Sequence, residues 1–333
     1  MIKKKLLITG GNGFIGSVLA KNLEKFYKIF IIDIQKNIFL DKKKFKTIYQ
    51  DLSNKKMVNI IIKNIKPEII IHLAAQSTVD FINKKKNLYI KNNILVTNNI
   101  VDAAEKFKIK KFIFASSASV YGNGNGKNIF DEESKLSPNN LYGKTKLINE
   151  LTIKKKFEKT FTRYCILRFF NVCSSDLKNC IGEFHSPETH LLPIIINKIH
   201  QSKNIYIYGK NYNTKDGTCV RDYIHILDVV AALKKSIVFL DKNKNGIFNL
   251  GTKNGFSVLQ LTKLCLKKIK SNTKIKFLKK RTGDNPTLIC NINKARNILK
   301  WKAKNSSINK IISDEIHWFK ILDKKKLFRE FIY

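Results

Sequence analysis

The segment LYGKTK, residues 141–146, places a tyrosine four residues before a lysine in a run with helical spacing. Side chains four residues apart lie on the same face of a helix, so Tyr142 and Lys146 are expected to be neighbours. A lysine cation beside a phenol favours the phenolate and lowers the pKa of the tyrosine from its usual value of about 10. The pair therefore predicts a general base that removes a proton from an alcohol. The same spacing also occurs on ordinary solvated helices, so other segments must decide whether this pair is catalytic.

Apolar runs typical of buried strands alternate with helical patterns through the first half of the chain. The runs are short and rich in isoleucine and phenylalanine, as expected of strands that are covered on both faces. Strands are predicted at 5–10, 28–33, 46–51, 68–75, 111–117 and 165–171, and helices at 13–26, 53–65 and 88–107. This alternation favours an α/β fold, namely a Rossmann-type doubly wound parallel sheet.

The alternation breaks down after about residue 172, where prolines and scattered glycines suggest a smaller, looser lobe. We predict a cofactor-binding Rossmann domain over residues 1–172 and a smaller α/β C-terminal lobe, mainly for substrate, over 173–333. The run GIFNLG at 246–251 has the pattern of a late strand. The chain is therefore expected to return to the first domain near 222–251.

The first predicted strand ends in TGGNGFIG, in which Gly10, Gly13 and Gly16 precede a helical pattern. A strand, a glycine-rich turn and a helix are the context of a dinucleotide fingerprint, because glycines let the backbone approach a pyrophosphate at a helix N-terminus. Asp33 ends the second strand, where a carboxylate can bond the adenosine ribose and repel a 2′-phosphate, so NAD is favoured over NADP. Asp51 has the position of an adenine contact, although a plain strand-end aspartate fits nearly as well.

Ser117 ends the fifth predicted strand, and the carboxyl ends of the strands in a doubly wound sheet face the ligand crevice. Ser117, Tyr142 and Lys146 are therefore expected to converge beside a nicotinamide ring. The serine would orient the proton, the tyrosine would accept it, and the lysine would tune the tyrosine. Such a site removes a proton from an alcohol while its hydride leaves for NAD.

Composition argues against several classes of protein. The 333 residues include 64 Lys and Arg against 25 Asp and Glu, but the lysines are spread along the whole chain. We therefore expect a solvated basic surface and no nucleic-acid partner. The six cysteines show no C-x-x-C pair or zinc spacing, which predicts reduced thiols and no metal. Apolar runs are too short for a signal peptide or a membrane span, so we expect a cytoplasmic protein with no membrane partner.

The glycine-rich turn followed by a serine and Tyr-x-x-x-Lys resembles the extended short-chain dehydrogenase/reductase superfamily. Four segments narrow this resemblance to the UDP-glucose 4-epimerases: GEFHSPETHLLP (182–193), DGTCVRDYIHILD (216–228), NLG (249–251) and RTGDNP (281–286). The similarity runs from the first strand to about Trp301. It implies a Rossmann lobe with a tightly retained NAD and a small C-terminal lobe that binds a UDP-sugar.

The resemblance assigns roles to matching residues of this chain. The implied catalytic residues are Ser117, Tyr142 and Lys146. The implied NAD-binding residues are Gly10, Gly13, Phe14, Ile15, Gly16, Asp33, Asp51, Leu52, Leu73, Ala74, Ala75, Asn92, Tyr142, Lys146 and Phe170. The implied substrate-binding residues are Ser117, Asn171, His190 and Leu191 (the last two beside the diphosphate), Ile207 and Tyr208 at the uracil, Arg221 and Arg281 at the phosphates, and Asp284 at the ribose.

The implied activity is the interconversion of UDP-glucose and UDP-galactose through a transient 4-keto intermediate, with Tyr142 as the base. A homodimer is the common assembly in the family. One position departs from the family's sequence pattern, and another leaves the sugar specificity open. Ser77 occupies the place of a lysine that many relatives have near the nicotinamide ribose, and Leu288 has an intermediate size where bulk gates N-acetylated sugars.

Three other functions are alternatives. A nucleotide-sugar 4,6-dehydratase needs an acid and a base, typically Asp-Glu, where this chain has Ala118 and Ser119. A uronic acid epimerase or decarboxylase would have different motifs in the substrate lobe. A non-catalytic nucleotide-binding member of the superfamily is disfavoured because Ser117, Tyr142 and Lys146 are all present.

Overall fold

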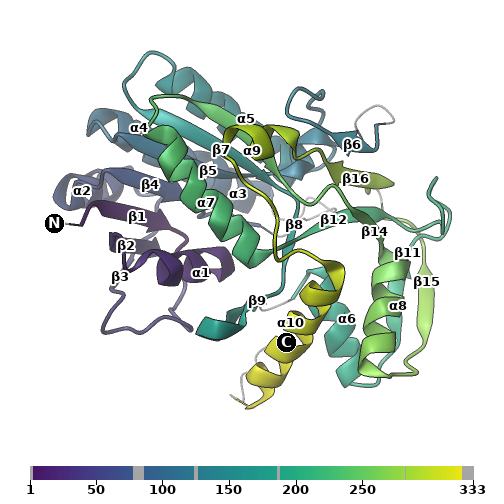
Figure 1. Ribbon diagram of the computed structural model, residues 1–333. Coiled ribbons are helices and arrows are strands. Elements are labelled where there is room, and N and C mark those ends of the chain that lie inside the picture. Colours follow the sequence, from purple (N-terminus) through teal and green to yellow (C-terminus); the bar gives the residue numbers. More distant parts are fainter. Residues whose placement is uncertain (1–2, 78–85, 124–126, 186–187, 282, 325–333) are drawn as a thin grey trace.

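A parallel sheet forms the larger of two lobes in the computed structural model, which describes residues 3–77, 86–123, 127–185, 188–281 and 283–324 (Figure 1). Within these residues the sheet has seven strands in the order β13-β7-β5-β4-β1-β2-β3. They are β1 (Lys5–Thr9), β2 (Lys28–Asp33), β3 (Thr47–Tyr49), β4 (Ile69–His72), β5 (Lys111–Ser117), β7 (Arg163–Phe169) and β13 (Gly246–Leu250). The order reverses between β1 and β4, which is where doubly wound sheets bind their ligands.

Helices cover both faces of this sheet. One face packs against α1 (Phe14–Leu23) and α7 (Ile226–Leu240), and the other against α2 (Lys55–Ile65), α4 (Val96–Lys106) and α5 (Leu141–Phe157). Successive strand residues point to opposite faces. Leu6 and Ile8 therefore join the first core, whereas Leu7 joins the second. The predicted doubly wound Rossmann-type sheet is confirmed.

The helix predicted at 88–107 is interrupted. It begins as α3 (Lys86–Tyr89), continues as a π-helical segment, η1 (Ile90–Leu95), and only then becomes α4. Asn93 in the π-helical segment is fully buried. Its side chain accepts a hydrogen bond from the backbone of Gln76 (2.7 Å) and donates one to Thr145 on α5 (3.0 Å). The wider turn thus lets one side chain join the loop after β4 to the helix that bears Tyr142.

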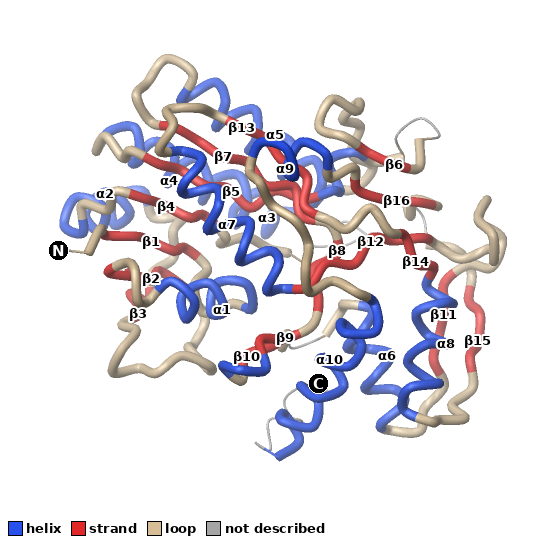
Figure 2. Tube along the Cα trace, in the orientation of Figure 1, coloured by secondary structure: helices blue, strands red, loops and turns tan. Residues whose placement is uncertain are grey.

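The smaller lobe contains short strands and three helices that share an apolar core (Figure 2). Its main sheet has the order β14-β12-β16-β6, and β8 pairs with β12. The strands are β6 (Ile129–Phe130), β8 (Asn171–Cys173), β12 (Val220–His225), β14 (Gly255–Ser257) and β16 (Thr287–Cys290), with the separate pairs β9 (Ser175–Asp176) and β10 (Ile181–Gly182), and β11 (Ile205–Tyr208) and β15 (Ile275–Leu278). The helices described in this lobe are α6 (Leu191–His200), α8 (Val258–Ile269) and α10 (Ile308–Lys324); the 3₁₀ turn η4 (Leu177–Asn179) follows β9, and the 3₁₀ turn η2 (Ala118–Tyr121) follows β5 of the larger lobe.

The chain crosses between the lobes several times. Strand β6, from the first half of the sequence, pairs with β16 of the smaller lobe. After β16, helix α9 (Asn293–Ile298) and Trp301 pack into the core of the larger lobe, and the Trp301 indole donates to the carbonyl of Asp228 (2.9 Å). The predicted boundary between the two domains at residue 172 therefore stays a prediction.

Among the described helices, none has the length and apolar character needed to cross a bilayer.

Candidate active site

The turn after β1 is built for close backbone approach. Gly10 has φ +70°, and a Cβ atom there would lie 2.7 Å from the backbone nitrogen of Ala74. A Cβ atom on Gly16 would lie 2.3 Å from the carbonyl oxygen of Gly10. Only glycine fits either position, so the turn packs directly against the loop after β4. Helix α1 follows with Gly13 as its N-cap and no side-chain cap, which leaves its N-terminus suited to a pyrophosphate.

Asp33 lies beside this turn at the end of β2. Its carboxylate accepts hydrogen bonds from the backbone nitrogens of Asn12 and Gln35, both at 2.9 Å. Burial raises the pKa of Asp33, and these backbone hydrogen bonds oppose the increase. The carboxylate is therefore fixed at the point where the sequence predicts the adenosine ribose.

Asp51 has a more exposed environment after β3. Lys91 in η1 makes an ion pair with it at 2.8 Å, and the backbone nitrogen of Ser53 donates to it at the same distance. Burial would raise the pKa of Asp51, but the hydrogen bonds from Lys91 and Ser53 outweigh it and lower the pKa. An adenine contact for Asp51 therefore stays a prediction.

The other predicted NAD residues lie around the turn. Phe14 and Leu52 are buried, and Ile15, Leu73, Ala74, Ala75 and Asn92 are half-buried. Phe170 directly follows β7 and is buried against Tyr121, with ring centres 6.5 Å apart. Ser77, at the position where the resemblance implies a lysine in many relatives, is exposed, and residues 78–85 lie outside the described part of the chain.

Ser117 and Tyr142 converge where β5 ends and α5 begins. Ser117 is the N-cap of the 3₁₀ turn η2, and Asn140 caps α5 by accepting a hydrogen bond from Gly143 (2.8 Å). A Cβ atom on Gly143 would lie 2.4 Å from the carbonyl oxygen of Ser119. The missing side chain at Gly143 thus lets α5 start directly against η2, which brings Tyr142 and Ser117 close enough for Ser117 to affect the pKa of the phenol.

Lys146 lies one turn further along α5 and is buried. Its Nζ atom donates to the carbonyl of Ala115 (2.7 Å) and lies 4.8 Å from the centre of the Phe114 ring and 5.7 Å from that of Tyr142. Burial lowers the pKa of Lys146 to about 7, although the charge of Glu150 opposes the shift.

The pKa of Tyr142 corrects one expectation from the sequence. Instead of a depressed value, burial raises the pKa of Tyr142 to about 12, and the hydrogen bond with Ser117 opposes the increase. The physical reason is the burial of the phenol itself, which penalises the phenolate. Burial also penalises the charged form of Lys146, so the lysine favours the phenolate less than the spacing argument assumed.

A buried ion pair supports this part of α5. Arg168 on β7 donates to both carboxylate oxygens of Glu150, at 3.0 Å from Nε and 2.7 Å from Nη2. Ser116 on β5 donates to the same carboxylate at 2.5 Å. The network holds α5 against β5 and β7, directly behind Ser117. Spacing arguments did not identify Glu150, although it lies four residues after Lys146 on the same helix face.

The predicted diphosphate and ribose residues gather in the smaller lobe. Arg221 on β12 makes an ion pair with Asp284 (3.1 Å) and donates to the carbonyl of Asn285 (2.7 Å). The guanidinium of Arg281 lies 3.8 Å from the centre of the Tyr208 ring. Ile207, by contrast, is buried, so its side chain is not available to a uracil ring and only its backbone remains a candidate.

The remaining substrate candidates lie at two junctions. Asn171 starts β8 and pairs with Tyr223 of β12, directly after Phe170. His190 is the N-cap of α6 and Leu191 is its first residue. His190 makes ion pairs with Glu183 (2.8 Å) and Glu188 (3.2 Å). Despite the cost of burial, these carboxylates raise the pKa of His190 well above its usual value.

Two asparagines that the sequence argument missed connect the lobes across the site. Asn139, three residues before Tyr142, donates to the carbonyl of Gly283 (2.6 Å) and to Asn285 (3.0 Å). Asn285 in turn donates to the carbonyl of Gly122 (2.5 Å). The loop that bears Arg281 and Asp284 is therefore tied to the start of α5. The signal was available in SPNNLYG and RTGDNP, whose asparagines flank the predicted site residues.

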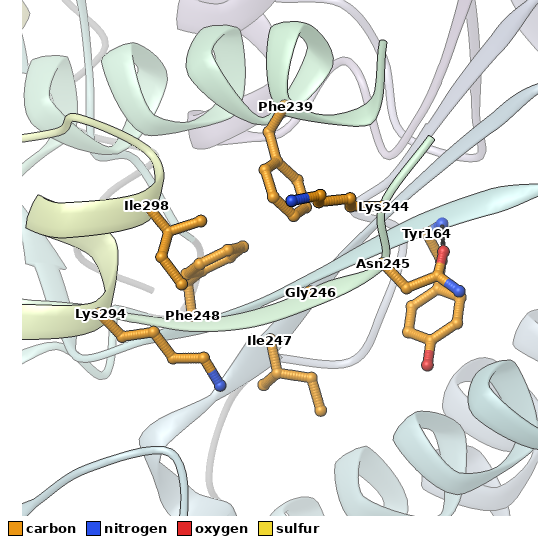
Figure 3. A pocket seen from close by; sticks show the side chains of 9 residues that line it. All are labelled: Tyr164, Phe239, Lys244, Asn245, Gly246, Ile247, Phe248, Lys294 and Ile298. Carbon is orange, nitrogen blue, oxygen red and sulfur yellow. Dashed lines mark hydrogen bonds between the residues drawn. The ribbon is translucent and has the colours of Figure 1, made fainter. Parts of the chain in front are cut away.

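A cavity of about 380 Å³ lies elsewhere on the larger lobe (Figure 3). It is lined by the starts of β7 and β13, the end of α7, and α9, including Tyr164, Gly246, Phe239 and Lys294. The starts of parallel strands lie at the edge opposite to Ser117, and no residue predicted for the site lines this cavity. It is not part of the candidate active site.

Comparison with known proteins agrees with this geometry. The model of the NAD dependent epimerase/dehydratase family matches residues 6–251. The UDP-glucose 4-epimerase of Halalkalibacterium halodurans is 32% identical over 319 residues, which is 95% of this chain and 95% of that protein. This chain belongs to the NAD dependent epimerase/dehydratase family. Membership confirms the predicted enzyme class and NAD as the cofactor, and the resemblance to UDP-glucose 4-epimerases is confirmed as well.

Solved members of the family have the same fold. The UDP-glucose 4-epimerase of Brucella ovis in complex with NAD superimposes with a TM-score of 0.87 at 28% identity, over 95% of this chain and 98% of that one. The enzyme of Bifidobacterium longum in complex with NAD⁺ and UDP gives a TM-score of 0.88 at 27% identity, over 97% and 99%. In this epimerase/dehydratase family member, the glycine cradle and the fixed Asp33 carboxylate fit such a dinucleotide.

Proposed function

We propose that this chain interconverts UDP-glucose and UDP-galactose, with Tyr142 as the proton acceptor. The observation that carries the proposal is that α5 starts directly against the turn after β5, which brings Tyr142 next to Ser117, with the Nζ atom of Lys146 5.7 Å from the centre of the Tyr142 ring. The relative from H. halodurans that covers 95% of this chain is a UDP-glucose 4-epimerase, which supports the same substrates here.

The proposed chemistry depends on three side chains. Tyr142 accepts the proton of the sugar 4-hydroxyl, and Ser117 hydrogen-bonds the same oxygen. Bound NAD supplies the hydride acceptor. Because the pKa of Tyr142 is about 12 in this structure, positive charge must gather beside the phenol before it acts as a base, and Lys146 is the side chain placed to contribute it. The result is inversion at C4 with no net oxidation.

The proposed substrate anchors are Arg221, Arg281 and Asp284. Guanidinium groups suit a diphosphate because they stay charged and donate in a fork. Their loop is joined to the start of α5 through Asn139 and Asn285, so a nucleotide held there is kept close to Tyr142. An anchored UDP leaves the sugar free to turn over within the site, as inversion requires.

We also propose a homodimer that pairs through α5 and the segment before α4. This face exposes a group of large apolar side chains, and α5 packs directly beside α3 and η1. The group consists of Leu88, Ile90, Leu95, Ile148 and Leu151. An apolar face shared by adjacent helices fits a second copy of the same face. Leu151→Glu should turn a dimer into a monomer in light scattering, and a wild-type monomer would refute the proposal. A cytoplasmic location stays a prediction.

One assay tests the proposed function. Purified protein is incubated separately with UDP-galactose, UDP-glucose and their N-acetyl forms, and the products are separated by chromatography. We expect UDP-galactose and UDP-glucose to interconvert without added NAD. A 4-keto-6-deoxy product would identify the dehydratase alternative, and no product from any of the four sugars would refute the proposal.

A further inference from the structure

Four ligand-type side chains gather in the segment between β10 and α6. The spacing is Glu-x-His-x-x-Glu-x-His, and the Glu-His cluster comprises Glu183, His185, Glu188 and His190. One ligand atom from each residue lies within 4.8 Å of the others. The sequence expectation of no metal considered only cysteine spacing and did not examine this segment.

The distances within the Glu-His cluster suit a small tetrahedral site. His190 Nδ1 lies 2.8 Å from Glu183 Oε1 and 3.2 Å from Glu188 Oε1. His185 Nδ1 lies 3.3 Å from Glu188 Oε2 and 3.7 Å from Glu183 Oε1. A tetrahedral zinc ion with bonds of about 2.0–2.1 Å separates its ligand atoms by about 3.4 Å. The nitrogen–oxygen separations lie on both sides of this value, with Glu188 facing His190 through Oε1 and His185 through Oε2, and the four ligand atoms need only draw together from within 4.8 Å to reach it.

An independent observation points to a missing cation. Glu183 is 1% exposed, and its Oε2 atom has no hydrogen-bond partner. A buried carboxylate oxygen without a partner is costly unless a charge compensates it.

The surroundings hold the carboxylates in place and leave an entry path. The Trp318 indole donates to the carbonyl of Glu183 (2.7 Å), and the backbone nitrogens of Thr189 and His190 both donate to Glu188 (2.7 Å). The imidazole of His185 is 27% exposed. The backbone at Glu183 and the carboxylate of Glu188 are therefore held by other groups, as metal-binding segments usually are, and His185 is partly open to solvent.

We propose that the Glu-His cluster binds one divalent cation of the zinc class. Two imidazole nitrogens with two carboxylate oxygens suit Zn²⁺, whereas Mg²⁺ prefers six oxygen ligands and keeps several waters. The ion would join the strand end at Glu183 to His190, the N-cap of α6. It would thereby fix the start of α6. The inference goes beyond the proposed function and does not depend on it.

The metal-free alternative is an ion-pair network in which His190 is protonated. Both arrangements use the same side chains, but only one of them binds a metal with definite stoichiometry. The alternative also leaves the Oε2 atom of Glu183 without a partner. A direct measurement of binding therefore separates the two.

The test uses the full chain without a histidine tag, with its NAD retained. The protein is stripped of divalent ions with a chelator, dialysed, and titrated with ZnCl₂ by calorimetry, with metal content checked by mass spectrometry. We expect one Zn²⁺ per chain with submicromolar affinity, and no stoichiometric binding of MgCl₂. His185→Ala and Glu183→Gln should each weaken Zn²⁺ binding at least tenfold.

The matched control is His317→Ala, which removes an exposed histidine from α10 outside the cluster. It should bind Zn²⁺ as the wild type does. Wild-type protein that binds no Zn²⁺, or binds it as tightly in both cluster variants, would overturn the inference. If circular dichroism shows that Glu183→Gln does not fold, the test rests on His185→Ala alone. That variant is expected to fold because the His185 side chain is partly exposed. Because the readout is binding, failure of the epimerase assay would leave this result unaffected.

Discussion

The Nζ atom of Lys146 lies 5.7 Å from the centre of the Tyr142 ring and donates a hydrogen bond to the carbonyl of Ala115 on β5. The ammonium is thus held between the sheet and the phenol, one helical turn from the group that it assists. Both side chains lie in an environment that disfavours charge, since burial raises the pKa of Tyr142 and lowers that of Lys146. The pKa values of both side chains should therefore shift strongly when a further charge enters the site.

Tyr142→Phe removes the proton acceptor and keeps the ring. Turnover of UDP-galactose should fall by about 10²–10⁴, the range expected for general base catalysis. NAD should remain bound, because the glycine turn is unaffected, and this is checked by the absorbance of nucleotide released on denaturation. Tyr164→Phe, at the opposite edge of the sheet, is the control and should be fully active. Near wild-type turnover in Tyr142→Phe would exclude the proposed mechanism.

Lys146→Met should change how stability depends on pH. The pKa of Lys146 is about 7 in the folded protein against 10.5 for the unperturbed group, so between these values the unfolded chain binds more protons. Wild-type stability therefore gains from this group as pH rises from about 7 to about 10.5, and the variant lacks that gain. The measurement is urea unfolding of cofactor-stripped protein. The free energy of unfolding of the variant, minus that of the wild type, should fall as the pH rises across this window.

The control for that experiment is Lys144→Met, an exposed lysine on the same helix. Its difference from the wild type should be nearly constant over the same pH range. A constant difference for Lys146→Met as well would show that Lys146 is not desolvated as the structure implies.

Arg221→Ala and Arg281→Ala should each raise the KM for UDP-sugar at least tenfold. A charge-assisted hydrogen bond contributes roughly 1.5–3 kcal/mol, and about 1.4 kcal/mol corresponds to a factor of ten. NAD content should be unchanged in both variants. Arg296→Ala, which removes an exposed arginine on α9, is the control and should keep the wild-type KM. A variant that loses NAD yet keeps its sugar affinity would move these arginines out of the substrate site.

Asp33→Ala should weaken NAD binding and relax the preference against NADP, because a fixed negative charge beside the ribose is removed. The measurement is the identity and amount of nucleotide that copurifies, followed by titration of both nucleotides into stripped protein. Asp41→Ala, an exposed aspartate in the loop after β2, is the control and should retain NAD. NADP as the sole nucleotide in the wild-type protein would contradict this reading of Asp33.

The sheet was predictable from the sequence because each strand is a short apolar run that must be buried on both faces. The strands β1 to β5 and β13 lie within the predicted ranges, whereas β7 begins and ends two residues before the range predicted for it. The π-helical segment was not predictable, because its cause is a tertiary contact: Asn93 reaches Gln76 and Thr145. Local spacing carries no information about such partners.

In the candidate site, too, local patterns were predictable from the sequence and tertiary contacts were not. The glycine turn and Tyr-x-x-x-Lys are local patterns, and α5 starts directly against the turn that Ser117 caps. Their protonation was not predictable, because burial depends on residues that are distant in sequence. The close approach at Gly143 and the bridge through Asn139 likewise depend on the partners Ser119 and Gly283.

Strand β13 has a consequence for synthesis. It pairs with β7 along its whole length but is encoded about 80 residues later, after much of the smaller lobe. The ribosome must therefore release residues up to Leu250 before the edge of β7 is covered, and until then that edge can pair with other chains. The nucleotide-binding lobe cannot be completed as an early, independent unit, so a nascent chain arrested near residue 172 should depend on chaperones.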